Sequence, residues 1–537
     1  MAKKEKNKSV ETTIWESCNK LRSNMTGINY MYFVMGLLFL KFAYMKFEKR
    51  REELLNSEDA AFVDIPSFYT EKNVFYIDPE ARWDFIVKNA KQPNIGLLID
   101  KAFELLEVKN EQLSGALPTG TYGKTSLPLD KFSSLINEVN KIKEDEEHPT
   151  QDLIGRVYQF FLNQFAVKTA DEKGEFYTPD DLVDLITELI EPYKGIVYDP
   201  CCGTGGMFVQ SLKFVDAHKG NTNQVSIYGQ ESNPDTWKLA KMNLAIRGIS
   251  ANLGKKNADT FGEDQFKDLK ADFIIANPPF NLKDWRAEDK LTTDYRWRGY
   301  GLPPVSNANY AWILHMLSKL SLNGVAGFLL ANGALGDSDT LDIRKNLIKN
   351  NNVEAIIICP REMFFYTDIS VTLWIMRKHK KAIKVLRDGK ETQLRDRSNE
   401  ILFIDLRRID TNKVNEAKKK REFSKENIQF VKTIYNNWLS PDYKNLYKDV
   451  PELCRSIKVY DEQLSDEEKK NNVPTIESQG WSLVPSKYIE FIDHDLNVDF
   501  PKEMTRIQKE MKDLLREEKE TQKELEDAFR GIGYGID

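Results

Sequence analysis

The sequence DPCCGTGGM at residues 199–207 decides the fold, and it directly follows the apolar run GIVY at residues 195–198. A short β-branched run followed by a glycine-rich turn predicts a strand that leads through a tight turn into a helix. Glycines let the backbone approach a ligand closely, and open parallel sheets bind cofactors at turns of this kind. A tight turn without a ligand has the same composition, so the turn alone does not establish a binding site.

Short apolar runs alternate with amphipathic segments throughout residues 151–410. A strand is expected at each of six runs, which are residues 195–198, 225–229, 272–276, 325–330, 353–358 and 371–376. Such alternation predicts a mostly parallel sheet with helices on both faces. The expected fold class is therefore α/β, with a Rossmann-like sheet in this central domain.

The N-terminal part of the chain differs from this central domain. Residues 1–150 are expected to be mainly helical, because apolar residues recur at helical spacing through residues 28–47 and 95–113. A charged run at residues 141–148, followed by Pro149, indicates the boundary between the two parts.

Beyond residue 411 the strand pattern is expected to give way to helical and irregular segments. Residues 504–527 carry apolar side chains at helical spacing among dense charges of both signs. This stripe fits a coiled-coil or partner-facing helix, and a solvated helix on its own domain has the same pattern. The expected domains are residues 1–150, 151–410 and 411–537, the last with a partner-binding helix.

The composition is that of a folded globular protein. Apolar residues make up 41% and charged residues 30% of the chain, which excludes disordered and collagen-like proteins. The net charge of −6 argues weakly against a nucleic-acid partner, because local basic patches or a second subunit could supply the contacts. The longest apolar stretch, residues 31–45, is too short for a membrane helix and contains Lys41, so we expect a buried helix and no membrane.

Cysteine and histidine usage predicts neither disulfides nor a metal site. The five cysteines are odd in number and form no CxxC pair, and the five histidines are scattered. The apolar stretch lies too far along the chain for a secretory signal and lacks a small-residue cleavage site. We therefore expect a cytoplasmic protein.

One acidic residue lies where a nucleotide-binding unit needs it, and a second is a weaker candidate. The second expected strand, SIYGQE, ends in Glu231, and a carboxylate at a strand tip can accept hydrogen bonds from ribose hydroxyls. A surface glutamate is the alternative, which the preceding glycine-rich turn disfavours. Asp259 is a weaker candidate for contact with the adenine of a cofactor, and a solvated loop aspartate fits it nearly as well.

The sequence NPPF at residues 277–280, after ADFIIA, is the sharpest signal in the chain. The lone pair of an exocyclic amine is delocalised into its ring, so a site that methylates the amine must accept hydrogen bonds from the amino hydrogens. The side-chain oxygen of Asn277 and a following backbone carbonyl can do this. Pro278 and Pro279 stiffen the loop, and Phe280 offers a face to an extruded base. A proline-rich turn that closes a strand is the alternative.

The order GEFYTP, DPCCGTGGM, GQE and NPPF resembles the amino methyltransferases of DNA in which the cofactor motifs precede the catalytic motif. More narrowly, the chain resembles the modification subunit of type I restriction-modification systems. Further stretches with this resemblance are GLLFLKF (36–42), VFYIDPEARWDF (74–85), YQFFLNQFA (158–166), DYRWRGYGLPPVSNANYAWILH (294–315) and GWSLVPSKYIEF (480–491).

The resemblance implies methyl transfer from S-adenosylmethionine to the exocyclic amino group of adenine in a specific DNA sequence, giving N6-methyladenine. Together with the residues discussed above, it places the cofactor site at Glu175, Phe176, Tyr177, Thr178, Pro179, Asp180, Asp199, Gly203, Thr204, Gly205, Gly206, Glu231 and Asp259. It places the catalytic loop at Asn277, Pro278, Pro279 and Phe280. Cys201 and Cys202 replace the small residues that are more usual in the turn.

The resemblance also implies several partners. These are double-stranded DNA, a DNA-specificity subunit with two copies of this chain per reader, and a restriction and translocase subunit. The sequence has no helix-turn-helix or zinc-finger signature, as expected if another subunit reads the DNA. It has no GxxxxGK[ST] motif, so ATP-driven translocation must belong to another polypeptide.

Two further segments are candidates for contact with DNA. Residues 281–306 interleave aromatic and arginine side chains, which slightly favours DNA over a subunit interface of the same composition. These side chains are Trp285, Arg286, Tyr295, Arg296, Trp297, Arg298 and Tyr300. Phe364 and Phe365 could form a second face for the base, although core aromatics are more frequent at such a position.

Two other functions compete with this interpretation. Methylation of a glutamine side chain in a protein also uses NPP followed by an aromatic residue. Such enzymes usually have tyrosine where this chain has Phe280, and they lack its long flanking regions. A non-catalytic scaffold could keep the fold, but it would be free to lose Glu231 and the NPPF loop.

Overall fold

The structure, a computed structural model, describes residues 10–21, 27–142, 156–162, 164, 178–364, 369–415, 420–492 and 500–531. It divides into two compact units, Met1–Ile489 and Glu490–Asp537. The described strands all belong to the first unit, and the described part of the second unit is a single helix apart from its first residues.

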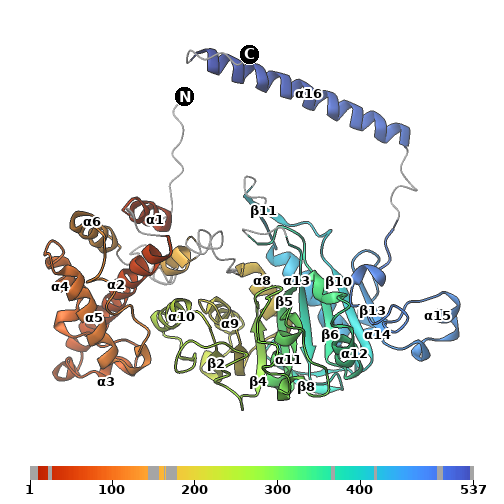
Figure 1. Cartoon of the computed structure of the whole chain (residues 1–537), viewed down its shortest axis with the longest axis horizontal. Helices are drawn as coiled ribbons and strands as arrows, with labels where there is room; N and C mark the ends of the chain where they lie inside the picture. The colour runs from red at the N-terminus through yellow and green to blue at the C-terminus, as the bar shows by residue number, and fades with distance from the viewer. Residues whose placement is uncertain are drawn as a thin grey trace. The chain divides into compact units, whose positions relative to one another are not determined.

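One nine-stranded sheet forms the centre of the first unit (Figure 1). The strands lie in the order β13-β10-β6-β7-β5-β4-β1-β2-β3. Their bounds are β1 (Gly195–Asp199), β2 (Val225–Gly229), β3 (Ala251–Asn252), β4 (Ala271–Ala276), β5 (Leu320–Ala331), β6 (Val353–Ile358), β7 (Val371–Arg377), β10 (Glu400–Asp405) and β13 (Cys454–Lys458). β7 is antiparallel to both its neighbours and β13 to β10, and all other neighbours are parallel.

The six expected strands are all present, and the sheet is mostly parallel. The prediction of an α/β fold with a Rossmann-like sheet is therefore confirmed. The expectation that strands end near residue 411 is wrong, because β13 extends the sheet beyond β10. Its sequence, CRSIK, is short and buries only Cys454 and Ile457, so it becomes a strand through pairing rather than through a strong local pattern.

Helices cover both faces of the sheet. One face carries α8 (Asp180–Ile190), α9 (Gly206–Ala217), α10 (Pro234–Ile246) and α13 (Lys425–Leu439), and the other carries α11 (Asn309–Lys319) and α12 (Leu341–Lys349). Each face has a hydrophobic core of its own. Neighbouring residues of β4 enter opposite cores, Ile274 with α11 and Ile275 with α8, as the two-residue period of a strand requires.

The N-terminal helices form a third hydrophobic core, as predicted for this part of the chain. They are α1 (Val10–Lys20), α2 (Gly27–Leu55), α3 (Ser67–Thr70), α4 (Trp83–Lys88), α5 (Ile95–Lys109) and α6 (Leu129–Asn140). Residues 33–42 of α2 are almost fully buried. The expectation that this stretch is too short is wrong, because Asn29–Leu55 of α2 is the one stretch among the described residues that is long and apolar enough to span a membrane, but 78% of its most apolar window is buried inside the protein. The expected buried helix is therefore confirmed.

The remaining elements are short. Two hairpins pair β8 (Ile383–Arg387) with β9 (Lys390–Leu394) and β11 (Asn412–Asn415) with β12 (Lys420–Glu422). The other helices are α14 (Tyr443–Leu446), α15 (Asp466–Lys470) and the 3-10 helices η1 (Ala60–Phe62), η2 (Pro79–Ala81), η3 (Glu111–Leu113), η4 (Thr222–Gln224), η5 (Tyr295–Trp297), η6 (Asn332–Leu335), η8 (Asp461–Gln463) and η9 (Pro485–Lys487).

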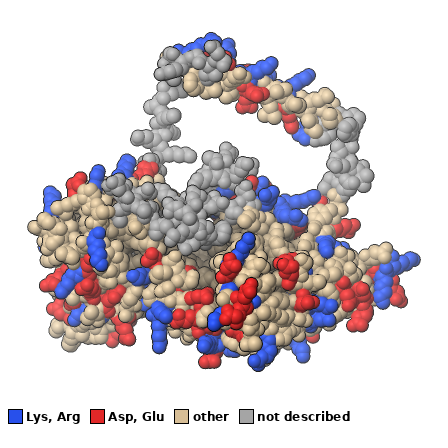
Figure 2. Space-filling model, viewed as in Figure 1, with Lys and Arg blue, Asp and Glu red and all other residues tan. Residues whose placement is uncertain are grey.

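The second unit contains α16 (Phe500–Gly531), a helix of 32 residues. Charged side chains of both signs lie along it (Figure 2). Its exposed apolar side chains are Met504, Ile507, Met511, Leu514, Leu515, Leu525 and Phe529. This confirms the expected helix with an apolar stripe.

Candidate active site

The glycine-rich turn has the backbone that its sequence predicts. β1 ends at Asp199, and α9 begins at Gly206. Gly203 and Gly205 adopt positive φ angles of 53° and 78°, which only glycine adopts without strain. A Cβ on Gly205 would also lie 3.3 Å from the side chain of Leu244. The turn is therefore fixed by backbone conformation and by close packing against α10.

Side chains from three elements hold this turn. Glu231, after β2, accepts a hydrogen bond from the backbone N–H of Gly203 through Oε2 at 3.0 Å. Asn243 of α10 donates from Nδ2 to the carbonyl of Thr204 at 2.8 Å. Asp199 accepts from the N–H of Cys201 at 3.0 Å, and burial raises the pKa of Asp199 to about 7. Sequence reasoning missed Asn243, because its spacing on α10 suggests only a helix.

Asn277 lies directly after β4, and only one of the two polar atoms of its side-chain amide is hydrogen-bonded to a described residue. Nδ2 donates to Oγ1 of Thr178 at 2.9 Å. Oδ1 is buried and has no hydrogen-bond partner among the described residues. A buried acceptor without a donor is costly and rare. This oxygen is the atom that the sequence assigned to the amino hydrogens of a target base.

Phe280, the last residue of the NPPF loop, is half-buried. Its ring lies 6.1 Å from that of Phe364, at 89° to it. Phe364 is only 4% exposed and belongs to the core, so it supports Phe280. Phe365 lies outside the described residues. The alternative of a core aromatic therefore applies to Phe364.

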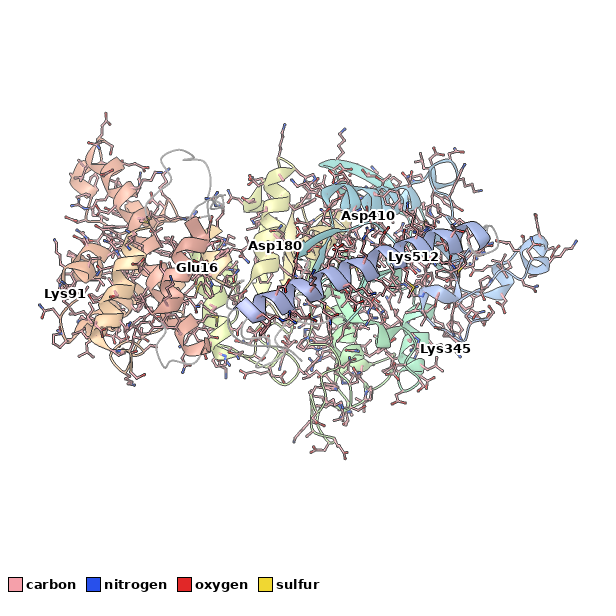
Figure 3. The ribbon with its side chains drawn as sticks, turned by 90° about the horizontal axis from the view of Figure 1, so that it is seen from above. Glu16, Lys91, Asp180, Lys345, Asp410 and Lys512 are labelled. Atoms are coloured by element: carbon pink, nitrogen blue, oxygen red, sulfur yellow. The ribbon has the colours of Figure 1, made fainter. Side chains whose placement is uncertain are left out.

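One pocket brings three distant segments of the sequence together. It has a volume of about 60 Å³ and is lined by Thr178, Asp180, Val183, Asp199, Cys201, Cys202, Gly203, Thr204, Gly206, Met207 and Asn277. Asp180, at the start of α8, is labelled in Figure 3. Val183 and Met207 were not predicted, although Val183 lies three residues after Asp180 and so shares its helix face.

Other predicted cofactor residues lie outside the lining of this pocket. Glu231 contacts the turn through the backbone N–H of Gly203. Asp259 is exposed and accepts hydrogen bonds from the N–H groups of Phe261 and Gly262, which favours a role in its own loop. Pro179 is buried beside the pocket. Glu175, Phe176 and Tyr177 lie outside the described residues.

Comparison with known proteins identifies the family. Residues 149–479 match the sequence model of the family described as N-6 DNA Methylase. The chain belongs to this family. Residues 10–142 of this N-6 DNA methylase also match the family described as HsdM N-terminal domain, and this match covers the helices α1 to α6.

Individual relatives narrow the family further. The N-6 DNA methylase is 31% identical to the type I restriction enzyme MjaIX methylase subunit of Methanocaldococcus jannaschii, over 98% of this chain and 91% of that protein. It is 36% identical to the HindI methylase subunit of Haemophilus influenzae, over 83% and 94%. A type I methyltransferase subunit of Streptococcus thermophilus has the same fold, with a TM-score of 0.69, 21% identity and coverage of 89% and 99%. The chain is therefore a modification subunit of a type I restriction-modification system.

The segment at residues 281–306 of this N-6 DNA methylase has a packed part, although its Tyr295 and Arg298 are exposed. Trp285, Arg296 and Trp297 are all buried. Arg296 forms an ion pair with Asp294 at 2.8 Å and donates to the carbonyl of Phe261 at 2.8 Å. The hypothesis that these three side chains contact DNA is therefore wrong, because they are inaccessible. Aromatic and arginine residues are also suited to bracing a long loop, and the sequence cannot distinguish the two uses.

Proposed function

We propose that this N-6 DNA methylase transfers a methyl group from S-adenosylmethionine to N6 of adenine at the pocket between the glycine-rich turn and Asn277. The observation that carries the proposal is the buried Oδ1 of Asn277, which lacks a donor among the described residues at the wall of that pocket. Leaving such an acceptor unpaired costs about 1 to 3 kcal/mol. The amino group of a target adenine is a donor of the required kind.

The residues around the pocket fit S-adenosylmethionine. A Cβ added to Gly203 or Gly206 would meet no atom within 4 Å, so the backbone of the turn is open to a ligand. Glu231, which holds Gly203 of the turn, is the proposed acceptor for the ribose hydroxyls, and Thr178 and Asp180 line the pocket. The cofactor supplies an electrophilic methyl group when it is bound. The residues of the turn hold and orient it.

The NPPF loop holds the base. A base inside a duplex cannot reach a pocket formed by strand ends, so the adenine leaves the helix before it reacts. The ring of Phe280 stacks on the extruded base. Oδ1 of Asn277 accepts a hydrogen bond from N6, while the bond from Nδ2 to Thr178 fixes the amide. This arrangement draws the lone pair of N6 out of conjugation and directs it towards the methyl group.

The other subunits supply sequence recognition and cleavage. The proposed assembly joins two copies of this chain to one DNA-specificity subunit through α16, with a restriction and translocase subunit in the larger complex. It acts on double-stranded DNA in the cytoplasm. Within the chain, the proposed domains are residues 1–150, 151–410 and 411–537, although β13 of the third region completes the catalytic sheet.

The test uses the full chain in complex with its specificity subunit. The complex is incubated with genomic DNA and with S-adenosylmethionine that carries a labelled methyl group, and mass spectrometry identifies the product. Labelled N6-methyladenine is expected from the wild type, and at least about 100-fold less in the same time from Asn277→Ala. Label in another base or in a protein glutamine would contradict the proposal, as would equal labelling by the variant.

A further inference from the structure

Helix α10 lies between the glycine-rich turn and the N-terminal helices. Its side chains Met242 and Ile246 belong to the hydrophobic core of the N-terminal helices. Lys46 of α2 donates from Nζ to the carbonyl of Ile246 at 2.6 Å. Lys241 donates from Nζ to the carbonyl of Ser114 at 2.8 Å. The N-terminal helices are therefore seated on α10.

The same helix holds the turn. Asn243 is fully buried, and its Nδ2 donates to the carbonyl of Thr204 at 2.8 Å. The next residue, Leu244, packs against Gly205. α10 thus contacts the turn through both a hydrogen bond and an apolar side chain.

Arg247 links these two sides of α10. Its guanidinium donates to the carbonyl of Asn243 at 3.1 Å and also to Oδ1 of the same residue. It donates as well to Oε1 of Gln159 at 3.4 Å. The neighbour of Gln159, Tyr158, is buried in the core of the N-terminal helices. Because Arg247 occupies Oδ1 of Asn243, the amide cannot turn over, and Nδ2 stays directed at Thr204.

We propose that Asn243 and Arg247 are positioning residues that make the geometry of the glycine-rich turn depend on how the N-terminal helices are seated. This rests on the proposed function, because it takes the turn to be the cofactor site. The turn contains Gly203 and Gly205, whose backbones can adopt many other conformations, so it loses its fixed geometry when a brace is removed. One brace is the carboxylate of Glu231, and the second is Asn243, which Arg247 connects to the N-terminal helices.

The first test compares Arg247→Ala with Lys241→Ala in the full chain. Each change removes a cation that contacts the N-terminal part of the chain, but only Arg247 also holds Asn243. Calorimetric titration with S-adenosylmethionine should show affinity reduced about five- to tenfold for Arg247→Ala, the scale set by its hydrogen bonds to Asn243, and less than about twofold for Lys241→Ala. Equal affinities of the two variants would overturn the proposal.

The hydrogen bonds that run from Gln159 through Arg247 and Asn243 to Thr204 form a relay. A double-mutant cycle separates the effect of this relay from a general loss of packing. Gln159→Ala and Arg247→Ala break the same relay, so the double variant should lose no more affinity than Arg247→Ala alone. Arg247→Lys keeps a cationic donor near Asn243 and should recover most of the lost affinity. A positioning role would be contradicted if the losses of affinity for S-adenosylmethionine in the two single variants added up in the double variant. It would also be contradicted if Arg247→Lys recovered no affinity.

The cysteines of the turn report its order without any cofactor. Burial raises the pKa of both Cys201 and Cys202, so alkylation by iodoacetamide is slow while the turn is braced. Mass spectrometry should show labelling at least about fivefold faster in Arg247→Ala and unchanged in Lys241→Ala, since only the first loses hydrogen bonds to Asn243.

This measurement also keeps the two proposals apart. If the wild type binds no S-adenosylmethionine and the labelling rates still respond as expected, the cofactor assignment fails and the relay stands. If the wild type binds S-adenosylmethionine and Arg247→Ala changes neither its affinity nor the labelling rates, the relay fails alone.

Discussion

Asn277 combines a structural and a chemical task in one amide. Nδ2 is bound to Thr178, and Oδ1 is buried without a donor among the described residues, in a residue that lines the pocket. We expect Asn277→Ala to leave the affinity for S-adenosylmethionine within about threefold, because a single bond to Thr178 is lost. Methyl transfer should fall by a factor of about 100 to 1,000, the effect of removing one preorganised polar group from a reaction site.

The measurements for Asn277 are calorimetry for the cofactor and single-turnover methylation for the chemical step. Asn277→Asp is the matched control, since it keeps an acceptor of the same length but loses the donor to Thr178. It should retain more activity than Asn277→Ala. Near-normal turnover of Asn277→Ala would contradict the assignment.

Glu231 supports the cofactor site in two ways. Its Oε2 accepts from Gly203 and its Oε1 from the N–H of Asn233, and in the proposed function its charge also binds the ribose hydroxyls. Glu231→Ala removes charge-assisted hydrogen bonds that contribute about 1.5 to 3 kcal/mol each, so the affinity for S-adenosylmethionine should fall at least about tenfold. Glu231→Gln keeps an acceptor for Gly203 and should lose less. Unchanged affinity of Glu231→Ala in calorimetry would refute this role.

Asp199 makes the stability of the chain depend on pH. Burial, and then the charge of Glu231, raises the pKa of Asp199 to about 7, from an ordinary value of about 3.9. Between these two values the folded chain holds a proton that the unfolded chain has lost. The free energy of unfolding therefore falls as the pH rises from about 4 to about 7, by on the order of 4 kcal/mol, and levels off above that range.

Asp199→Asn tests this dependence because asparagine does not ionise and still offers an oxygen to the N–H of Cys201. Urea unfolding measures the free energy of unfolding at pH 5 and at pH 8. Its fall between these two pH values should be about 3 kcal/mol smaller in the variant than in the wild type. Asp216→Asn, on the exposed side of α9, should keep the loss seen in the wild type. If the free energy of unfolding fell by the same amount in Asp199→Asn as in the wild type, the carboxyl of Asp199 would not cause the pH dependence.

At the scale of elements, α16 differs from every other long helix that the structure describes. Its apolar stripe is exposed, with Met511 at 59% and Leu514 at 65% of their accessible area. A stripe at coiled-coil spacing between charges of both signs suits the helix of a partner. We expect Met511→Glu combined with Leu514→Glu to abolish co-purification with the specificity subunit, while cofactor affinity stays unchanged.

The control for α16 is Lys509→Glu, because residue 509 lies on the opposite side of the helix from the stripe. It introduces a similar charge and should keep the partner. A chain that ends at residue 492 should behave as the double variant does. Retention of the specificity subunit by this shortened chain would place the interface elsewhere.

At the scale of the whole molecule, the charge is unfavourable for DNA binding by this chain alone. The net charge is −6, and positive and negative side chains are interspersed over the described residues on the face shown in Figure 2. Affinity for DNA grows with the number of phosphates that a protein neutralises. We therefore expect the purified chain to methylate no defined sequence, and addition of the specificity subunit to restore methylation at one sequence.

Sequencing of modified adenines in genomic DNA measures this outcome. The Asn277→Ala chain with its specificity subunit is the control for background methylation. Efficient methylation of one defined site by the single chain would mean that this chain reads DNA itself.

The sequence alone determined the six central strands, the N-terminal helices and the two motifs of the site. These features are local, because the burial of a segment imposes a period of two or about 3.6 residues on its own apolar side chains. The conformation of the turn at Gly203 and Gly205 can also be predicted from the local sequence, since a positive φ favours glycine at that position.

Only the tertiary structure decided which side chains meet. The contact of Asn277 with Thr178 spans 99 positions, and no periodicity in either segment specifies it. The burial of Trp285 and Trp297 and the pairing of β13 with β10 likewise depend on neighbours from distant segments. Hydrogen-bonding and apolar side chains suit a binding surface and a packed loop equally well. The difference between the two lies in what covers them, which the fold of the whole chain sets.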